Sequence, residues 1–378
     1  MTRYFLKGEA QSRFTQDRID LIPKLAHLCE QHGAEFVVVC GDVFDSNHVA
    51  PQTVVRAVEK LSRFPYPMFI LPGNHDPLNA ASVYDSDAFR ALPEQIVVVR
   101  DSSIQRSEKL PSIEILGAPW FNKQPTTDLC GQLLDSLEPV ASGVTRIVLA
   151  HGQLDSLMPD TSHPACISRD KIKLALKECK LHYVALGDRH SVTDCDDSGR
   201  VWYSGTPIAT DFVETDPNTV LLVDATAGID PRPRVEAIDS GQWRFLRVAE
   251  NVDSPEDLQR LQDALADIEN KERTSVTLGL SGSISLAVNA NLDKLLEKYR
   301  DLFASLRMDD NRSDLSVVPD QLEYEELALS GYARTCWDEL AETAKQEATG
   351  SNEAISDEAR VARDALALMY RLADRGTP

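Results

Sequence analysis

Four short apolar runs in this 378-residue sequence each end beside residues whose side chains can bind a metal ion. The runs and the side chains that follow them are residues 36–40 with Asp42, 68–71 with Asn74, 146–150 with His151, and 183–186 with Asp188 and His190. Taken singly, a Gly-Asp or His-Gly pair is typical of a turn. Their recurrence at the ends of apolar runs favours a shared site. Carboxylate, amide and imidazole ligands without thiolates suit Mn, Fe or Zn at a hydrolytic centre better than structural zinc or calcium.

The elements that must position these side chains are predicted from the same runs. Continuous Val/Ile/Leu-rich segments without alternation are typical of strands that are covered on both faces. Helical patterns separate the first runs: Ile22, Leu25 and Cys29 share one helix face, and residues 54–61 resemble a second helix. Strands that alternate with helices predict an α/β fold, in which ligands collect beyond the carboxyl ends of the strands.

Gly41, Gly73 and Gly187 each directly precede a candidate ligand. A residue without a Cβ atom allows the chain to turn sharply off a strand and to approach an ion closely. We therefore expect the backbone to be tightly packed at these three positions.

The composition bounds the function. A net charge of −21 argues against tight autonomous DNA binding, because such proteins usually present a basic face. Much of the acid lies late in the chain, as in residues 253–267 and 323–358, and bound cations would reverse the local field at an acidic site. The seven scattered cysteines predict neither a disulfide framework nor a zinc ribbon. Without a long apolar run or a signal segment, the sequence predicts a cytoplasmic protein with no membrane contact.

The blocks at the strand ends resemble the calcineurin-like metallophosphoesterase superfamily, whose pattern is D-x-H, G-D-x-x-D, G-N-H-D/E, a histidine, then G-H-x-H. The last four blocks are present in order, the final one in altered form. Within the superfamily the chain is similar to the SbcD-type DNA-repair exonuclease subunits, with residues 203–208 similar to their Y-x-G-S/T-P segment. The resemblance implies an α/β fold in which helices flank a β-sandwich, a small α+β cap domain and a helical C-terminal tail.

The resemblance also implies roles at a site with two divalent ions, for which Mn²⁺ is favoured. Asp42 would bridge both ions, Asn74, His151 and Asp188 would complete one site, and His190 would belong to the other. For the catalytic step, the family pattern implies that His75 orients the scissile phosphate or protonates the leaving oxygen, and that Asp76 holds His75 in place.

Two departures from the family pattern bear on activity. The final block reads Gly-Asp-Arg-His, so Asp188 stands where a histidine is usual, and we expect an altered metal preference. The D-x-H block is missing, because residues 1–13 contain neither Asp nor His. We expect the natural chain to begin upstream of Met1; the alternative is a non-catalytic subunit. As written, the chain should bind the second ion poorly and show little nuclease activity.

Three regions are predicted. Residues 1–228 form the nuclease domain without its first strand, residues 240–319 a ferredoxin-like cap of order β-α-β-β-α-β, and residues 320–378 a helical tail. By resemblance, the tail docks on an SbcC-type coiled-coil ATPase, and the protein acts on DNA as a homodimer within a heterotetramer. Two alternatives stay open: a small-molecule phosphodiesterase on the same fold, and a non-catalytic scaffold.

Overall fold

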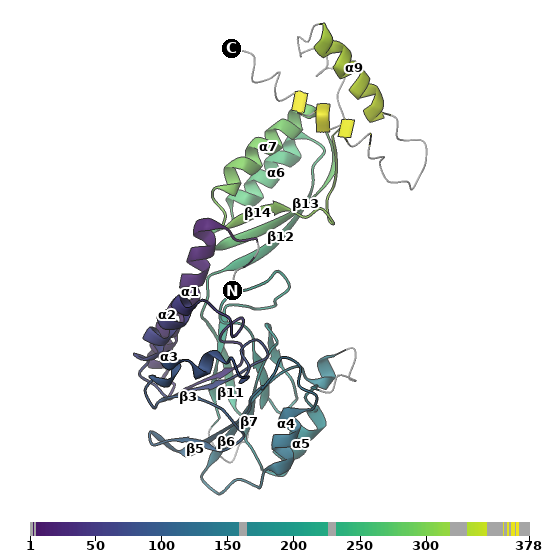
Figure 1. The fold of residues 1–378 in the computed structure, drawn as a ribbon. Helices are drawn as coiled ribbons and strands as arrows, with labels where there is room; N and C mark the ends of the chain where they lie inside the picture. The colour runs from purple at the N-terminus through teal and green to yellow at the C-terminus, as the bar shows by residue number, and fades with distance from the viewer. Residues whose placement is uncertain are drawn as a thin grey trace. The chain divides into compact units, whose positions relative to one another are not determined.

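The computed structural model describes residues 3, 5–158, 165–225, 232–317 and 331–345, together with 358, 361–362, 364–366 and 368–369. The chain forms two compact units (Figure 1). The first comprises Met1–Arg3 and Gln11–Trp243, and the second comprises Tyr4–Ala10 and Arg244–Pro378.

The first unit contains three sheets. Its strands are β1 (Val37–Cys40), β2 (Met68–Leu71), β3 (Ile96–Val98), β4 (Gln105–Ser107), β5 (Leu110–Ala118), β6 (Thr145–His151), β7 (Tyr183–Gly187), β8 (Val192–Asp194), β9 (Val201–Ser204), β10 (Thr219–Asp224) and β11 (Arg234–Asp239). One sheet is parallel, in the order β1-β2-β3; the second has the order β4-β5-β6-β7-β9-β8 with antiparallel edges; and β10 pairs with β11. The four predicted strands are confirmed as β1, β2, β6 and β7.

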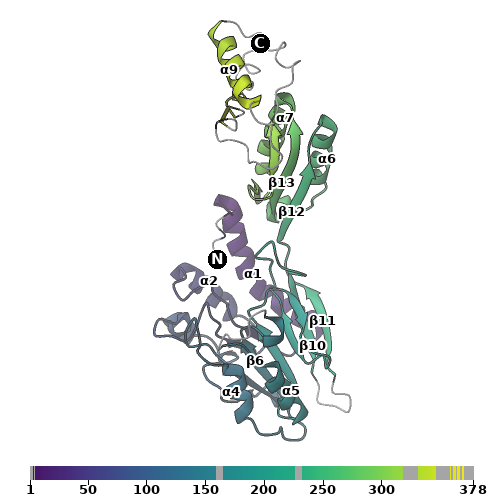
Figure 2. The ribbon, with the colours of Figure 1, turned by 90° about the vertical axis from the view of Figure 1, so that its right-hand side faces the viewer.

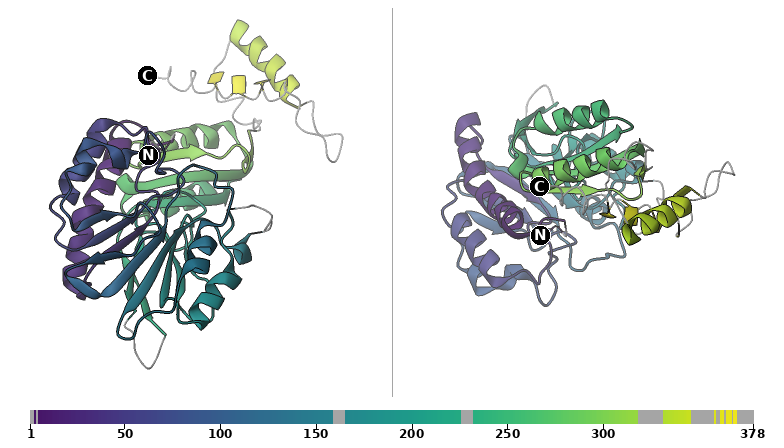
Figure 3. Two further views of the ribbon diagram at one scale, coloured as in Figure 1. Left: turned by 60° about the horizontal axis from the view of Figure 1, so that its bottom comes forward. Right: turned by 90° about the horizontal axis from the view of Figure 1, so that it is seen from above.

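Helices cover the outer faces of the two larger sheets. They are α1 (Gly8–His32), α2 (Pro51–Leu61), α3 (Asp87–Arg90), α4 (Leu129–Ser136) and α5 (Arg169–Lys177). The α1 and α2 helices share a core with the outer face of the β1–β3 sheet (Figure 3), and α4 and α5 share one with β5, β6 and β7 (Figure 2). A third core lies between the two sheets. This layered α/β arrangement agrees with the predicted fold class.

The β2 strand shows why its apolar run does not alternate. Met68 and Ile70 lie in the core beneath α1 and α2, whereas Phe69 and Leu71 lie in the core between the sheets. Both faces are therefore buried, as expected for a parallel strand between two layers.

The second unit contains one wholly parallel sheet, with α6 and α7 packed in one core against it (Figure 1). Its elements are β12 (Arg244–Asn251), α6 (Pro255–Ala266), β13 (Thr274–Ile284), α7 (Leu286–Arg300), β14 (Ser305–Met308), β15 (Asp314–Val317) and α9 (Tyr332–Lys345). The order β-α-β-α-β-β differs from the predicted ferredoxin-like order, which is wrong.

Two local features explain the error. Gly282, with a φ of +121°, continues β13 and pairs with Leu315, so the predicted break between two strands does not occur. Ser285 then caps α7 by accepting the Val288 N–H, so this helix begins directly after β13 and not after a further strand. Between the first two predicted regions, Arg234 begins β11, which pairs with β10.

The tail prediction is tested only in part. The α9 helix buries Trp337, Ala341 and Ala344 in a cluster that also contains Ala362 and Leu366. Residues 318–330, 346–357 and 370–378 of the predicted tail region and its approach lie outside the described part of the chain. Within the described residues, no helix is both long and apolar enough to cross a membrane.

Candidate metal centre

Asp42 occupies the turn directly after β1. Its φ of +56° is in the left-handed region, which few residues other than glycine adopt. The Asp42 Oδ1 atom accepts the backbone N–H of His75 at 3.0 Å, and this bond links the loops after β1 and β2. Burial raises the pKa of Asp42, and the nearby charge of His151 lowers it in part, with a net rise.

His151, the last residue of β6, has a fully buried side chain. Its Nδ1 atom lies 2.7 Å from the carbonyl oxygen of Cys40, which can only accept, so Nδ1 carries the proton. The Nε2 atom lies 3.0 Å from Asn74 Oδ1, the assigned amide oxygen. When Nε2 carries no proton, it directs a lone pair at the remaining ligands.

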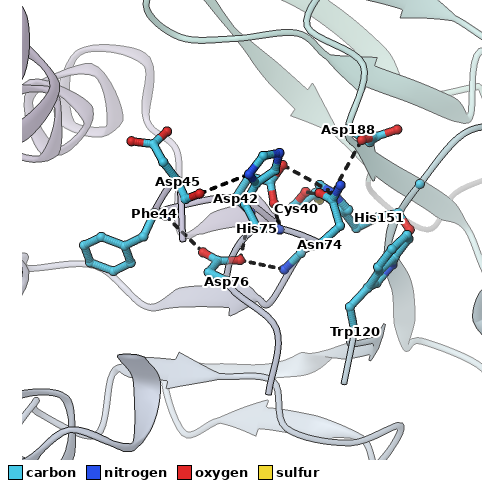
Figure 4. Close-up of polar contacts among 12 residues, drawn as sticks. Cys40, Asp42, Phe44, Asp45, Asn74, His75, Asp76, Trp120, His151 and Asp188 are labelled. Atoms are coloured by element: carbon cyan, nitrogen blue, oxygen red, sulfur yellow. Dashed lines mark hydrogen bonds and ion pairs between the residues drawn. The ribbon is translucent and has the colours of Figure 1, made fainter. Parts of the chain in front are cut away.

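Two carboxylates face the same Nε2 atom. Asp42 Oδ2 lies 3.5 Å and Asp188 Oδ1 lies 3.8 Å from His151 Nε2. Ligand atoms of the three residues all lie within 4.8 Å of one another, and Figure 4 shows Asn74 beside them. Several acceptors that face one lone pair repel one another, and a cation at their centre would satisfy them all. The donor set therefore fits a divalent ion, and Asp42, Asn74, His151 and Asp188 are brought together as predicted.

The three glycines permit this convergence. A Cβ atom on Gly41 would lie 2.0 Å from His151 Nδ1, and Gly41 itself has a φ of +90°. A Cβ atom on Gly73 would lie 2.4 Å from Asp42 Oδ1, and one on Gly187 would lie 1.6 Å from the Cys40 carbonyl oxygen. The predicted close approach is confirmed at each position.

Asp76 does not have its predicted partner. Its carboxylate is fully buried and accepts hydrogen bonds from four groups of the described chain, none of them the His75 imidazole. The donors are the N–H groups of Asp42 (3.2 Å), Phe44 (3.0 Å) and Gly73 (2.8 Å), and the Tyr84 hydroxyl (2.6 Å). Asp76 therefore holds the backbone of the metal-binding loops.

The His75 imidazole is held by the main chain. Its Nδ1 atom lies 3.0 Å from the Asp45 carbonyl oxygen and donates to it (Figure 4). The predicted contact with Asp76 fails because the Asp76 carboxylate lies beneath the turns, where backbone N–H groups converge on it.

His190 is not part of the three-residue cluster among the described residues. Its side chain is 49% exposed, and Nδ1 lies 2.8 Å from Oε1 of Glu214, whose own side chain is buried. The hydrogen bond to Glu214 raises the pKa of His190, and burial lowers it in part. A carboxylate behind one ring nitrogen is common for metal-binding histidines, so the role of His190 at a second ion stays a prediction.

Sequence reasoning missed several supporting residues. Trp120 Nε1 donates to the His151 carbonyl at 2.6 Å, and its ring contacts the imidazole edge-on. Tyr84 and Glu214 are buried partners of Asp76 and His190. Trp120 follows β5 but has no ligand-type side chain, and Tyr84 and Glu214 lie away from the strand ends, so only the fold brings these distant residues to the site.

Comparisons with known proteins agree with this geometry. The profile of the calcineurin-like phosphoesterase family matches residues 15–223, more than half of the chain, and the chain therefore belongs to this family. Family membership indicates metal-dependent phosphoester hydrolysis. No curated protein matches the sequence.

Two solved structures show distant similarity. The TT1561 protein of Thermus thermophilus is 12% identical, with a TM-score of 0.38, over 59% of this chain and 94% of that chain. A second structure is 13% identical with the same TM-score of 0.38, over 59% of this chain and 95% of that one.

Proposed function

We propose that this chain hydrolyses phosphodiester bonds in DNA as the nuclease subunit of an SbcC–SbcD-like repair complex. The observation that carries the hydrolytic part is the convergence of Asp42, His151 and Asp188, with Asn74 beside them, in a member of a phosphoesterase family. These four residues would hold a divalent ion, with Mn²⁺ favoured.

When bound, a divalent ion would supply Lewis acidity to the phosphate and would lower the pKa of water. The chain's own residues orient the substrate. Since His75 Nδ1 donates to the Asp45 carbonyl, Nε2 is the ring atom left for the substrate. When protonated, Nε2 would orient the phosphate or protonate the leaving oxygen, a contribution of about 10²–10⁴-fold in rate.

The partner assignment is supported by the tail. Although α9 buries one stripe, Tyr332 is 87% exposed, and Val361 and Leu368 are also exposed. Exposed apolar side chains beside a packed stripe fit a partner helix. We propose that this partner is an SbcC-type coiled-coil ATPase within a cytoplasmic heterotetramer. An ATPase that itself binds DNA would also compensate for the net charge of −21.

A non-catalytic scaffold is the second candidate. It is supported by the described residues, among which one cluster of candidate ligands, Asp42, His151 and Asp188, is found. A single ion gives less catalytic assistance than a pair, so we expect slow hydrolysis from this chain.

Mn²⁺ titration of the whole chain tests the proposal. We would measure Mn²⁺ binding by calorimetry and cleavage of end-labelled duplex DNA and of a model diester, with His151→Ala and the exposed Asp197→Asn as a matched pair. Slow Mn²⁺-dependent DNA cleavage that only His151→Ala abolishes is the expected result.

Each other outcome points elsewhere. Hydrolysis of the model diester without action on DNA would favour a small-molecule phosphodiesterase. Mn²⁺ binding without hydrolysis would favour the scaffold. Fast DNA cleavage would refute the expectation that the second ion binds poorly.

A further inference from the structure

Arg3 is a mostly buried arginine with few partners. Its side chain is 15% exposed, and its backbone N–H donates to Gln11 Oε1 at 2.9 Å. The guanidinium Nη1 lies 4.0 Å from Asp211 Oδ2, which is too long for a hydrogen bond. The Nε atom is buried and has no hydrogen-bond partner among the described residues.

The other carboxylates near Arg3 have their own donors. Burial lowers the pKa of Arg3, and the charges of Asp211, Glu214 and Asp45 raise it in part, so all three lie within electrostatic range. Asp45 Oδ2 accepts from Arg18 at 3.1 Å.

Glu214 is likewise engaged. Its Oε1 atom accepts from the imidazole of His190 at 2.8 Å, and Oε2 accepts the Thr210 N–H at 2.8 Å. A guanidinium stays charged at neutral pH, and unmatched buried donors are costly. Such a group is poised to bind an anion.

Contacts connect Arg3 to the residues around His190. Its Nη1 atom lies 4.0 Å from Asp211, and the hydroxyl of the preceding residue, Thr210, lies 3.0 Å from His190 Nδ1. The charges of Asp45 and Glu214 also act on Arg3, and the Asp45 carbonyl holds His75. The guanidinium therefore lies near the residues that hold the proposed metal ligand His190.

We propose that Arg3 binds the non-bridging oxygens of the substrate phosphate, next to the ion held by Asp42, His151 and Asp188. A planar guanidinium can donate two parallel hydrogen bonds to a phosphate and also supplies fixed positive charge. This inference rests on the proposed phosphodiester hydrolysis. It adds a substrate-binding residue outside the strand-end blocks, in a chain whose net charge is −21.

Phosphate binding separates this role from a structural ion pair with Asp211. We would titrate the whole chain with inorganic phosphate by calorimetry, both metal-free and loaded with Mn²⁺, and record the melting temperature of each variant. Arg3→Gln should weaken phosphate binding about ten- to a hundredfold, and Arg3→Lys should fall between that variant and wild type. Exposed Arg63→Gln, whose native partner is Glu59 on α2, should bind as wild type does.

Asp211→Asn is the decisive control. It removes the carboxylate but leaves the guanidinium, so phosphate affinity should stay equal or rise. Equal phosphate affinity in wild type and Arg3→Gln, or no phosphate binding by wild type, would overturn the inference. Arg3-dependent phosphate binding without any hydrolysis would instead count against the proposed function alone.

Discussion

Asp76→Asn tests whether a buried carboxylate organises the metal-binding loops. Asp76 Oδ1 accepts from Asp42 and Gly73, and Oδ2 accepts from Phe44 and Tyr84. An asparagine at this position keeps one acceptor oxygen, but its NH₂ group replaces the other oxygen and faces two hydrogen-bond donors. The amide can turn its NH₂ toward either pair of donors. Facing Phe44 and Tyr84 costs less, because the Tyr84 hydroxyl can rotate and accept a hydrogen bond from the NH₂.

The magnitude follows from that orientation. The Phe44 N–H would be left unpaired at a cost of about 1–3 kcal/mol, and the Asp42 and Gly73 bonds would weaken by about 1 kcal/mol each as their acceptor loses its charge. Relief from burying that charge offsets part of this, so we expect a loss of about 3 kcal/mol. For a unit of this size, such a loss lowers the melting temperature by about 6–12 °C. Mn²⁺ affinity should fall about ten- to a hundredfold, because the Asp42 backbone loses its support.

Calorimetric melting and Mn²⁺ titration of the whole chain measure both effects. The matched variant is Tyr84→Phe, which removes one donor to Asp76 and strands no backbone group. It should cost about 2 kcal/mol but leave Mn²⁺ affinity within about threefold of wild type, because its bond does not reach Asp42. The reasoning is refuted if Asp76→Asn has the melting temperature of wild type, or if Asp76→Asn and Tyr84→Phe weaken Mn²⁺ binding by the same factor.

Two further predictions concern the frame of the site. Gly187→Ala places a Cβ atom 1.6 Å from the Cys40 carbonyl oxygen and should lower the free energy of unfolding by more than about 3 kcal/mol, measured by chemical denaturation. Gly143 is the control: it has a φ of +80°, but a Cβ atom there would meet nothing within 4 Å, so Gly143→Ala should cost only about 1 kcal/mol. Burial raises the pKa of Glu114, but its hydrogen bonds and ion pair with Arg146 outweigh this and hold it below the ordinary 4.5. The carboxylate therefore stabilises the fold above about pH 4.5, and the stability gap between wild type and Glu114→Gln should shrink as the pH falls further.

Much of the site could be predicted because parallel strands impose its geometry. Asp42 and Asn74 follow paired β1 and β2, and His151 pairs in register with Gly187. The carboxyl ends of neighbouring parallel strands meet at one edge, so residue types at strand ends suffice to place these ligands.

The remaining features depend on contacts that have no local sequence pattern. The family pattern implied that Asp76 holds His75, yet its partners include backbone groups brought together by the turns after β1 and β2. Glu214 lies far along the chain from His190 and meets it only in the folded unit. In the second unit, the predicted order required a break between two strands, but cross-strand pairing with β15 keeps Gly282 within β13.

The backbone conformation of Asp42 and Asp188 distinguishes a metal-binding site from two ordinary turns. Both residues have left-handed φ values, +56° and +94°, and each directly follows a glycine. A turn with no other task would place glycine or asparagine in the left-handed position, where an aspartate costs about 1–3 kcal/mol. Here the glycine is required one residue earlier, by close approach to His151 or Cys40, and the aspartate takes the strained position. That placement directs both carboxylates at His151 Nε2. A bound cation would stabilise the two carboxylates there and so offset the backbone strain at both residues.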